Sequence, residues 1–245
     1  TQKILMVGFA LFFYYYMGLE GVILGIGLSF FPYLTRIYKS LRKDKLDFSL
    51  IRPRIGFIMN SYVLDLTRTF SGYTDKLIVA PLFGFAILGN YQLGIQILAI
   101  LTILPGIVYQ YILPRDSSGD SNKKLKKLTI TVSIILAGLG FILAPIILPI
   151  LFPKFTEAIE VIQIVSISVI PSTINLMYIS KFLGNELSKI VLIGSGVFLL
   201  VQIISIFILG ELIGVNGVAM ALVLGASAEA IFLVTVNKVI YKLTD

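Results

Sequence analysis

Long apolar runs without a charged residue make up most of this chain. Most of them approach the ~20 residues that an α-helix needs to cross the hydrocarbon core of a bilayer. Their periodicity is that of helices buried in lipid and not that of barrel strands. The runs cover residues 4–19, 21–35, 77–114, 128–153, 161–180, 190–210 and 212–228. The pattern therefore predicts an all-α, polytopic membrane protein.

The run 77–114 is too long for a single span. In its middle, the stretch GFAILGN at 84–90 offers the residues that favour a turn. We therefore expect about eight transmembrane helices. Prolines inside the spans, among them Pro105 and Pro171, are typical of kinked helices, which suit a transporter but also occur in static bundles. The expected helices lie near residues 3–18, 20–38, 55–82, 88–112, 128–152, 158–180, 189–209 and 214–237.

Composition supports the membrane assignment and narrows the chemistry. Apolar residues make up 57% of the 245 residues and charged residues 13%, whereas about a quarter of the residues in soluble domains are charged. Mean hydropathy is +0.97. The chain has no cysteine and no histidine, which excludes disulfides, thiolate chemistry and imidazole metal sites or bases. We expect no metal and no cofactor, so any proton handling must use carboxylates.

The loops alternate in charge. Loops on one face of the membrane carry most of the basic residues. The loops on the opposite face carry Lys154, with Lys76 nearby, and otherwise the acids Glu20, Glu157, Glu160 and Glu211. By the positive-inside rule, the basic loops and both termini of the chain are cytoplasmic. This alternation also supports eight spans, because one helix more or fewer would scramble it. The basic set is Arg36, Lys39, Arg42, Lys43, Lys45, Arg52, Arg54, Arg115, Lys123, Lys124, Lys126, Lys127, Lys181 and Lys189, with Lys3, Lys238 and Lys242 near the ends.

One expected span, near 55–82, is charged in its middle. An isolated arginine near the bilayer centre costs ~3 kcal/mol or more, so Arg68 cannot face lipid. At 100° per residue it shares an arc of about 80° with other polar and small positions. These are Ser61, Asp65, Gly72 and Asp75.

Two interpretations of this polar stripe stay open. In the first, Asp65 and Arg68 form a buried pair that fixes packing, and Asp75 with Lys76 marks the outer interface. In the second, the stripe lines a water-filled substrate cavity, in which Arg68 attracts an anionic group and the carboxylates balance it or titrate.

Polar residues in other spans are further candidates. Glu229 lies near the middle of the last expected helix and is a candidate for coupling transport to an ion, H⁺ or Na⁺. The alternative is a glutamate hydrogen-bonded to a neighbouring helix. Gln92 and Gln96 share one helix face and could meet sugar hydroxyls, although single polar groups in membrane helices usually only join helices.

Two other functional classes fit the sequence poorly. A net charge of +7 would suit nucleic acid, but the basic residues lie in short loops without interleaved aromatic residues. An enzyme acting on lipid-linked sugars needs histidine or a carboxylate cluster near a membrane face, and the sequence has no histidine and no DxD motif. We expect neither a nucleic-acid partner nor an enzyme.

Several segments resemble the polysaccharide-transporter branch of the MATE-like MOP flippase superfamily. A polar helix ends in Asp75 and Lys76, the segment LIVAPLFGFAILGNYQLGIQILAI follows with Gly89 and Tyr91, and ILPRDSSG then leads into a basic loop. ILFPKFTEAIEVIQIVS is similar to another family segment, with Pro153 in place of the usual glycine, and ELIGVNGVAMALVLGASAEA at 211–230 is similar to the start of the family's last helix.

The resemblance implies a fold and a function. Residues 1–45 would be the last two helices of an N-terminal lobe, and residues 46–245 a complete six-helix C-terminal lobe. The chain would then come from a longer reading frame with about four further helices. The implied activity is flipping of a polyprenyl-linked oligosaccharide, carried on a phosphate or diphosphate, to the outer leaflet of the plasma membrane by alternating access. A multidrug or organic-cation exporter of the same fold is the alternative, and an inactive truncated membrane scaffold is the alternative from a different class.

Overall fold

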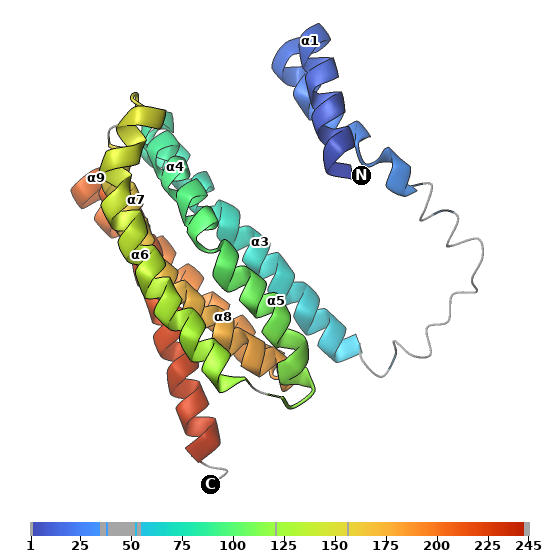
Figure 1. Ribbon diagram of the computed structural model, residues 1–245, viewed down its shortest axis with the longest axis vertical. Helices are drawn as coiled ribbons and strands as arrows, with labels where there is room; N and C mark the ends of the chain where they lie inside the picture. The colour runs from blue at the N-terminus through green and yellow to red at the C-terminus, as the bar shows by residue number, and fades with distance from the viewer. Residues whose placement is uncertain are drawn as a thin grey trace. The chain divides into compact units, whose positions relative to one another are not determined.

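A computed structural model describes residues 2–34, 38, 52, 55–120, 122–155 and 157–242. Within these residues the secondary structure is helical (Figure 1). The chain divides into two compact units, Thr1–Ile55 and Gly56–Asp245. The expected boundary between residues 45 and 46 lies outside the described residues, and the assignment of the two parts to an N-terminal and a C-terminal lobe stays a prediction.

The first unit contains a tight helical hairpin. Helix α1, Gln2–Leu28, is broken at Gly18, whose backbone has φ 62° and ψ −140°. The two arms then pack with their backbones in contact, because a Cβ atom on Gly25 would lie 2.6 Å from the carbonyl carbon of Phe9, and one on Gly21 would collide with the backbone of Phe13. The break at Gly18 confirms the two helices expected near 3–18 and 20–38, the second as far as it is described.

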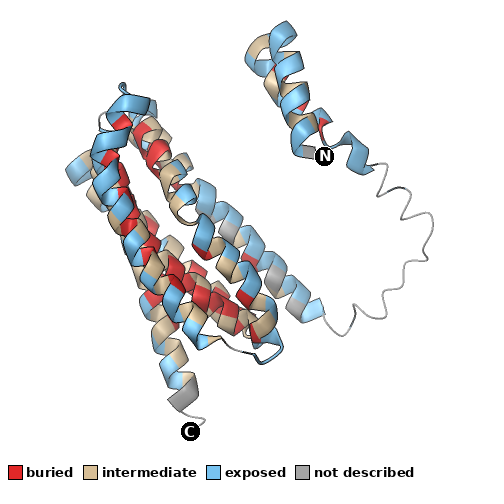
Figure 2. Cartoon of the chain, viewed as in Figure 1, coloured by how far each residue is buried: buried red, intermediate tan, exposed pale blue. Residues whose placement is uncertain are grey.

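The second unit is a bundle of long helices. Its elements are α3 (Ile55–Phe83), α4 (Phe85–Leu101), α5 (Ile103–Ser117), α6 (Lys123–Leu151), α7 (Ala158–Ile167), α8 (Val169–Gly184) and α9 (Ser188–Lys242). In Figure 1 they run along a common direction. Buried residues lie on their facing sides, as Figure 2 shows for α6, α7 and α8.

Breaks within these elements separate the expected spans. Gly84, with φ 87°, ends α3 and starts α4, so the turn lies at this residue alone and residues 85–90 are already helical. Helices α4 and α5 form one bent pair, with 49° between them, where a single helix at 88–112 was expected. Ser168 separates α7 from α8. Helix α9 is broken at Ile213 and Gly214.

By length and composition, four helical stretches among the described residues can cross a membrane, and five if α4 and α5 count as one span. Two of the four, Lys3–Leu34 and Ser188–Ile240, contain the breaks at Gly18 and Gly214. A Cβ on Gly217 would collide with the backbone of Leu209, so the two arms of α9 also fold back on each other. Each of these two stretches is therefore a hairpin of two helical arms. With α6, the α4–α5 and α7–α8 pairs and the charged helix α3, which is not among the four, the described residues contain helices in the places of the expected eight.

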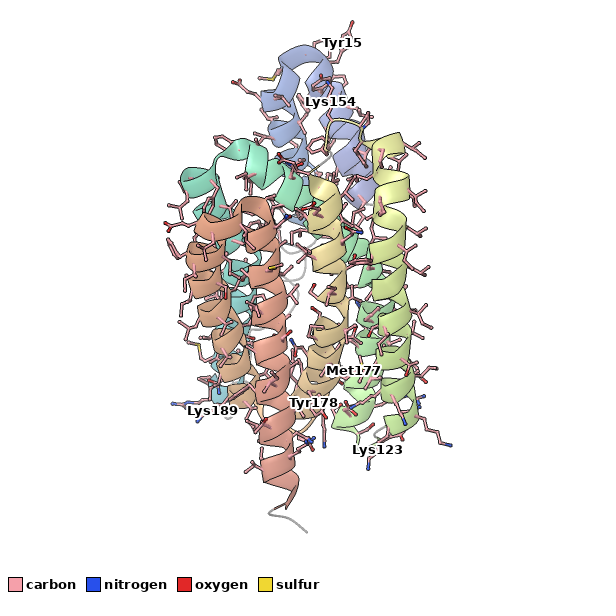
Figure 3. All side chains as sticks on the ribbon, turned by 90° about the vertical axis from the view of Figure 1, so that its left-hand side faces the viewer. Tyr15, Lys123, Lys154, Met177, Tyr178 and Lys189 are labelled. Carbon is pink, nitrogen blue, oxygen red and sulfur yellow. The ribbon has the colours of Figure 1, made fainter. Side chains whose placement is uncertain are left out.

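Apolar clusters hold the second unit together. One joins Val79 of α3 to Tyr91, Val161 and Ile206, and another joins Leu64 of α3 to Phe182, Val191 and Leu233. Helix α8 packs against α5, α6 and α9, and α7 packs against α4, α6 and α9. Figure 3 shows Lys123 and Lys189 at one end of this bundle and Lys154 at the other, the alternation that the loop charges predict.

Candidate functional site

The polar stripe of α3 does not lie in one environment. Asp65 and Gly72 are exposed on the surface of the second unit, whereas Asp75, nearer the end of the helix, is only 4% exposed. Ser61 and Arg68 lie on α3, but their side chains are outside the described structure, so the Asp65–Arg68 pair stays a prediction. The stripe therefore has an open part and a buried part.

Asp75 belongs to a hydrogen-bonded cluster. Its Oδ2 accepts a 2.7 Å hydrogen bond from the hydroxyl of Tyr91, and its Oδ1 accepts a 2.8 Å bond from the backbone N–H of Lys76. The Tyr91 hydroxyl also hydrogen-bonds with the side chain of Gln202. Tyr91 and Gln202 are 0% and 1% exposed. The cluster thus ties α3 to α4 and α9 through buried polar groups.

The two glutamines of α4 differ in their surroundings. Gln92 is half-buried, and its Oε1 has no hydrogen-bond partner among the described residues, whereas Gln96 is exposed. The cavity beside α4 is lined by Ile95, Leu98 and Ala99 of that helix. A role for Gln92 and Gln96 in binding sugar therefore stays a prediction.

Glu229 lies at a cavity of about 510 Å³. Helices α4, α8 and both arms of α9 contribute its lining, together with Thr102 at the bend between α4 and α5. The Nδ2 of Asn175 donates to Oε2 of Glu229 at 2.9 Å and to the carbonyl of Ala226 at 3.0 Å. Glu229 is 8% and Asn175 5% exposed. The structure thus brings together two polar residues that are far apart in the sequence.

The lining of this cavity is suited to a small cation. The Oδ1 of Asn175 has no hydrogen-bond partner within the described parts of the chain, and Ser195 and Thr102 add hydroxyl oxygens to the lining. A carboxylate with neutral oxygen donors is the set that hard cations prefer, and a carboxylate within the membrane can also carry a proton. No group of three histidine, cysteine, aspartate or glutamate residues able to hold a metal occurs among the described residues.

The sequence singles out Glu229 but not the residues around it, and its role in ion coupling stays a prediction. Asn175 is one of several polar residues within the apolar runs, and nothing in its immediate sequence singles it out. The signal that was present is Pro105, which follows Thr102 by three positions. A proline has no N–H to give to the carbonyl one turn earlier, so it predicts a kink at that point.

The end of the bundle opposite to Lys123 and Lys189 carries acidic residues. Glu157 accepts a 3.0 Å hydrogen bond from Nδ2 of Asn90, and Glu160 accepts one from Nδ2 of Asn216. Both glutamates line a cavity of about 560 Å³ that Gly214 also borders. The acids of these loops are therefore tied to α4 and α9.

Comparison with solved structures shows the fold. No family model and no curated protein matches this chain. The chain is similar to a point mutant of VcmN, a MATE transporter of Vibrio cholerae, with a TM-score of 0.72 and 14% identity over 98% of this chain and 60% of that one. It is also similar to a MATE protein in the bent conformation, with a TM-score of 0.71 and 15% identity over 99% and 61% of the two chains. The chain spans about three-fifths of the length of these structures. It has a MATE-like membrane fold.

Proposed function

We propose that this chain is part of a membrane transporter that flips a polyprenyl-linked oligosaccharide from the cytoplasmic to the outer leaflet of the plasma membrane. The exposed face of α3 carries this proposal. Asp65 is exposed in the middle of a helix of spanning length, and a charged side chain at that depth is too costly to leave in lipid. This face therefore lines a water-filled path.

The sign of the substrate charge follows from Arg68. A guanidinium holds phosphate oxygens by paired, charge-assisted hydrogen bonds. A polyprenyl phosphate or diphosphate presents such oxygens at the point where the lipid meets the sugar. Asp65 beside it would keep the cavity near neutral when no substrate is bound.

An organic-cation exporter of the same fold is the second candidate. The exposed Asp65 and the cavity-lining Glu229 favour it, because a cationic substrate would be attracted by carboxylates and repelled by Arg68. The MATE-like fold is compatible with either substrate.

The test is transport in proteoliposomes. We would compare flipping of a fluorescent polyprenyl-diphosphate oligosaccharide with uptake of ethidium, for the native protein and for Arg68→Ala. Lys189→Ala, a change of an exposed lysine in the first turn of α9, is the matched control. We expect lipid flipping that Arg68→Ala abolishes and Lys189→Ala preserves. Uptake of ethidium without lipid flipping would refute the flippase proposal and support the organic-cation exporter. Lipid flipping unchanged in Arg68→Ala would keep the flippase and remove Arg68 from the site.

Ion coupling is the second part of the proposal. We propose that Glu229 takes up and releases a proton or Na⁺ during transport, since it accepts a hydrogen bond from the Asn175 amide and lines a cavity that hydroxyl groups also line. Glu229→Gln would keep a hydrogen-bonding side chain of the same size but remove the charge. Transport by this variant should then no longer depend on a pH or Na⁺ gradient.

A further inference from the structure

The second unit contains another cavity, about 640 Å³ in volume, at the end of the bundle where its lysines gather. It lies between the end of α5, the start of α6, α8 and the last turns of α9. Four lysines and one carboxylate line it. These are Lys123, Lys126, Lys127, Lys181 and Asp116. The cavity shares no lining residue with the one at Glu229.

Three of its charged groups, Asp116, Lys126 and Lys181, are held in place. The Oδ2 of Asp116 accepts hydrogen bonds of 2.6 Å from both Nζ of Lys126 and Oγ of Ser180. The side chains of Lys126 and Asp116 are 13% and 2% exposed. The Nζ of Lys181 donates to Oδ1 of Asn237 at 2.8 Å. Lysines fixed in this way lose less conformational entropy on binding than lysines in an open loop.

The cavity carries an excess of positive charge. Lys123 and Lys126 repel Lys181, and Asp116 attracts it. Helix α6 begins at Lys123, and its first turn contains no acidic residue. The N–H of Leu125 in this turn already donates to Oδ1 of Asn122 at 3.0 Å, so α6 adds to the lysines through the positive end of its dipole. An anion with several oxygens would balance this charge.

Two further features distinguish a lipid from a free anion. Ile130, Met177 and Tyr178 form an apolar part of the lining, and Figure 3 shows Met177 and Tyr178 further into the bundle than Lys123. The Oδ1 of Asp116, a residue 6% exposed, has no hydrogen-bond partner within the described residues. It would accept a hydrogen bond from a ligand hydroxyl. The cavity therefore suits a molecule with a phosphate, a hydroxyl donor and an apolar tail.

We propose that this cavity binds the headgroup of an anionic phospholipid of the phosphatidylglycerol type. The lysines and the start of α6 hold the phosphate, Oδ1 of Asp116 accepts from a glycerol hydroxyl, and the acyl chains leave along the apolar part of the lining. The site anchors the loop between α5 and α6 to the membrane surface. It does not depend on which substrate the protein transports.

Native mass spectrometry of the purified protein in detergent tests this site, with phosphatidylglycerol as the ligand and phosphatidylcholine as the comparison. The variant is Lys123→Gln with Lys127→Gln, both exposed residues that line the cavity. The control is Lys124→Gln with Lys189→Gln, which removes the same charge from exposed residues outside the lining. We expect about thirtyfold weaker phosphatidylglycerol binding in the first variant, from about 1 kcal/mol per lysine, and no change in the second.

Three results would overturn the proposal. Equal losses in the two double variants would mean that the lipid responds only to general surface charge. Phosphatidylcholine bound as tightly as phosphatidylglycerol would mean that the phosphate and hydroxyl are not recognised. Displacement of the lipid by the same concentration of inorganic phosphate would make this a free-anion site. Melting temperatures without lipid check that both variants fold. Lys181→Gln, whose amide can still donate to Asn237, is the second variant if the first does not fold.

Discussion

The hydrogen bond between Asp75 and Tyr91 gives the sharpest test of how the second unit is held together. Tyr91→Phe removes one hydroxyl and leaves the ring in the apolar cluster around Val79. Asp75 keeps its bond from the backbone of Lys76 but loses the 2.7 Å bond from Tyr91. The loss falls on a carboxylate that is 4% exposed, so water does not readily replace the lost donor.

Two ranges of stabilisation energy apply to this hydrogen bond. A hydrogen bond to a charged group contributes about 1.5–3 kcal/mol to the stability of soluble proteins. Hydrogen bonds between membrane helices average about 0.6 kcal/mol and reach about 1.7, because the unfolded chain in the membrane also finds partners. Since both residues are buried and one is acidic, we expect a value near the upper membrane limit, about 1.5 kcal/mol.

A double-mutant cycle measures the bond itself. The free energy of unfolding would be determined in mixed micelles for the native protein, Tyr91→Phe, Asp75→Asn and the double variant. Tyr62→Phe, on the same unit but 60% exposed, is the control and should change stability by less than about 0.5 kcal/mol. A coupling energy below about 0.5 kcal/mol would refute the structural role of the pair. A large loss of transport by Asp75→Asn at unchanged stability would instead place Asp75 in the substrate path.

Three further predictions test other parts of the structure. Gly140→Leu should lower the free energy of unfolding by about 1–3 kcal/mol, because a Cβ there would collide with the side chain of Ser166 on α7. Gly138→Leu, with open space around it, should not lower it, and equal effects of the two variants would contradict the packing of α6 on α7. Gly214→Ala should cost about 1 kcal/mol because φ is 60° at the break in α9, and a stable variant would mean that the break tolerates a side chain. Glu229→Gln should remove the pH or Na⁺ dependence of transport in proteoliposomes, and a retained dependence would place coupling elsewhere.

The helices of this protein could be predicted because lipid imposes a length on each apolar run. The breaks were only partly predictable. Pro105 and Pro171 each lie three residues after a break, at Thr102 and Ser168, as expected from the missing proline N–H. Pro81 and Pro145, however, lie inside continuous helices. A proline therefore marks where a helix can bend, and the neighbouring helices determine whether it does.

The pairing of polar groups could not be predicted from the sequence. Asp75 and Tyr91 meet only because Gly84 turns the chain so that α4 folds back along α3. Asn175 and Glu229 meet through the packing of α8 on the second arm of α9. Each contact depends on the rotation of a helix about its own axis. In an almost uniformly apolar chain, few residues specify that rotation.

The two buried carboxylates of the second unit have different surroundings, and this difference supports different roles. Asp75 is packed among Tyr91, Gln202 and the backbone of Lys76, and its two oxygens already have donors. Glu229 also has a donor, Asn175, but it lines a cavity that reaches the bend between α4 and α5. A carboxylate that exchanges ions needs a path to solution and neighbours that can move. A helix break beside it allows those neighbours to move. On these grounds we assign the ion-coupling proposal to Glu229, and we expect Asp75 to fix the position of α3.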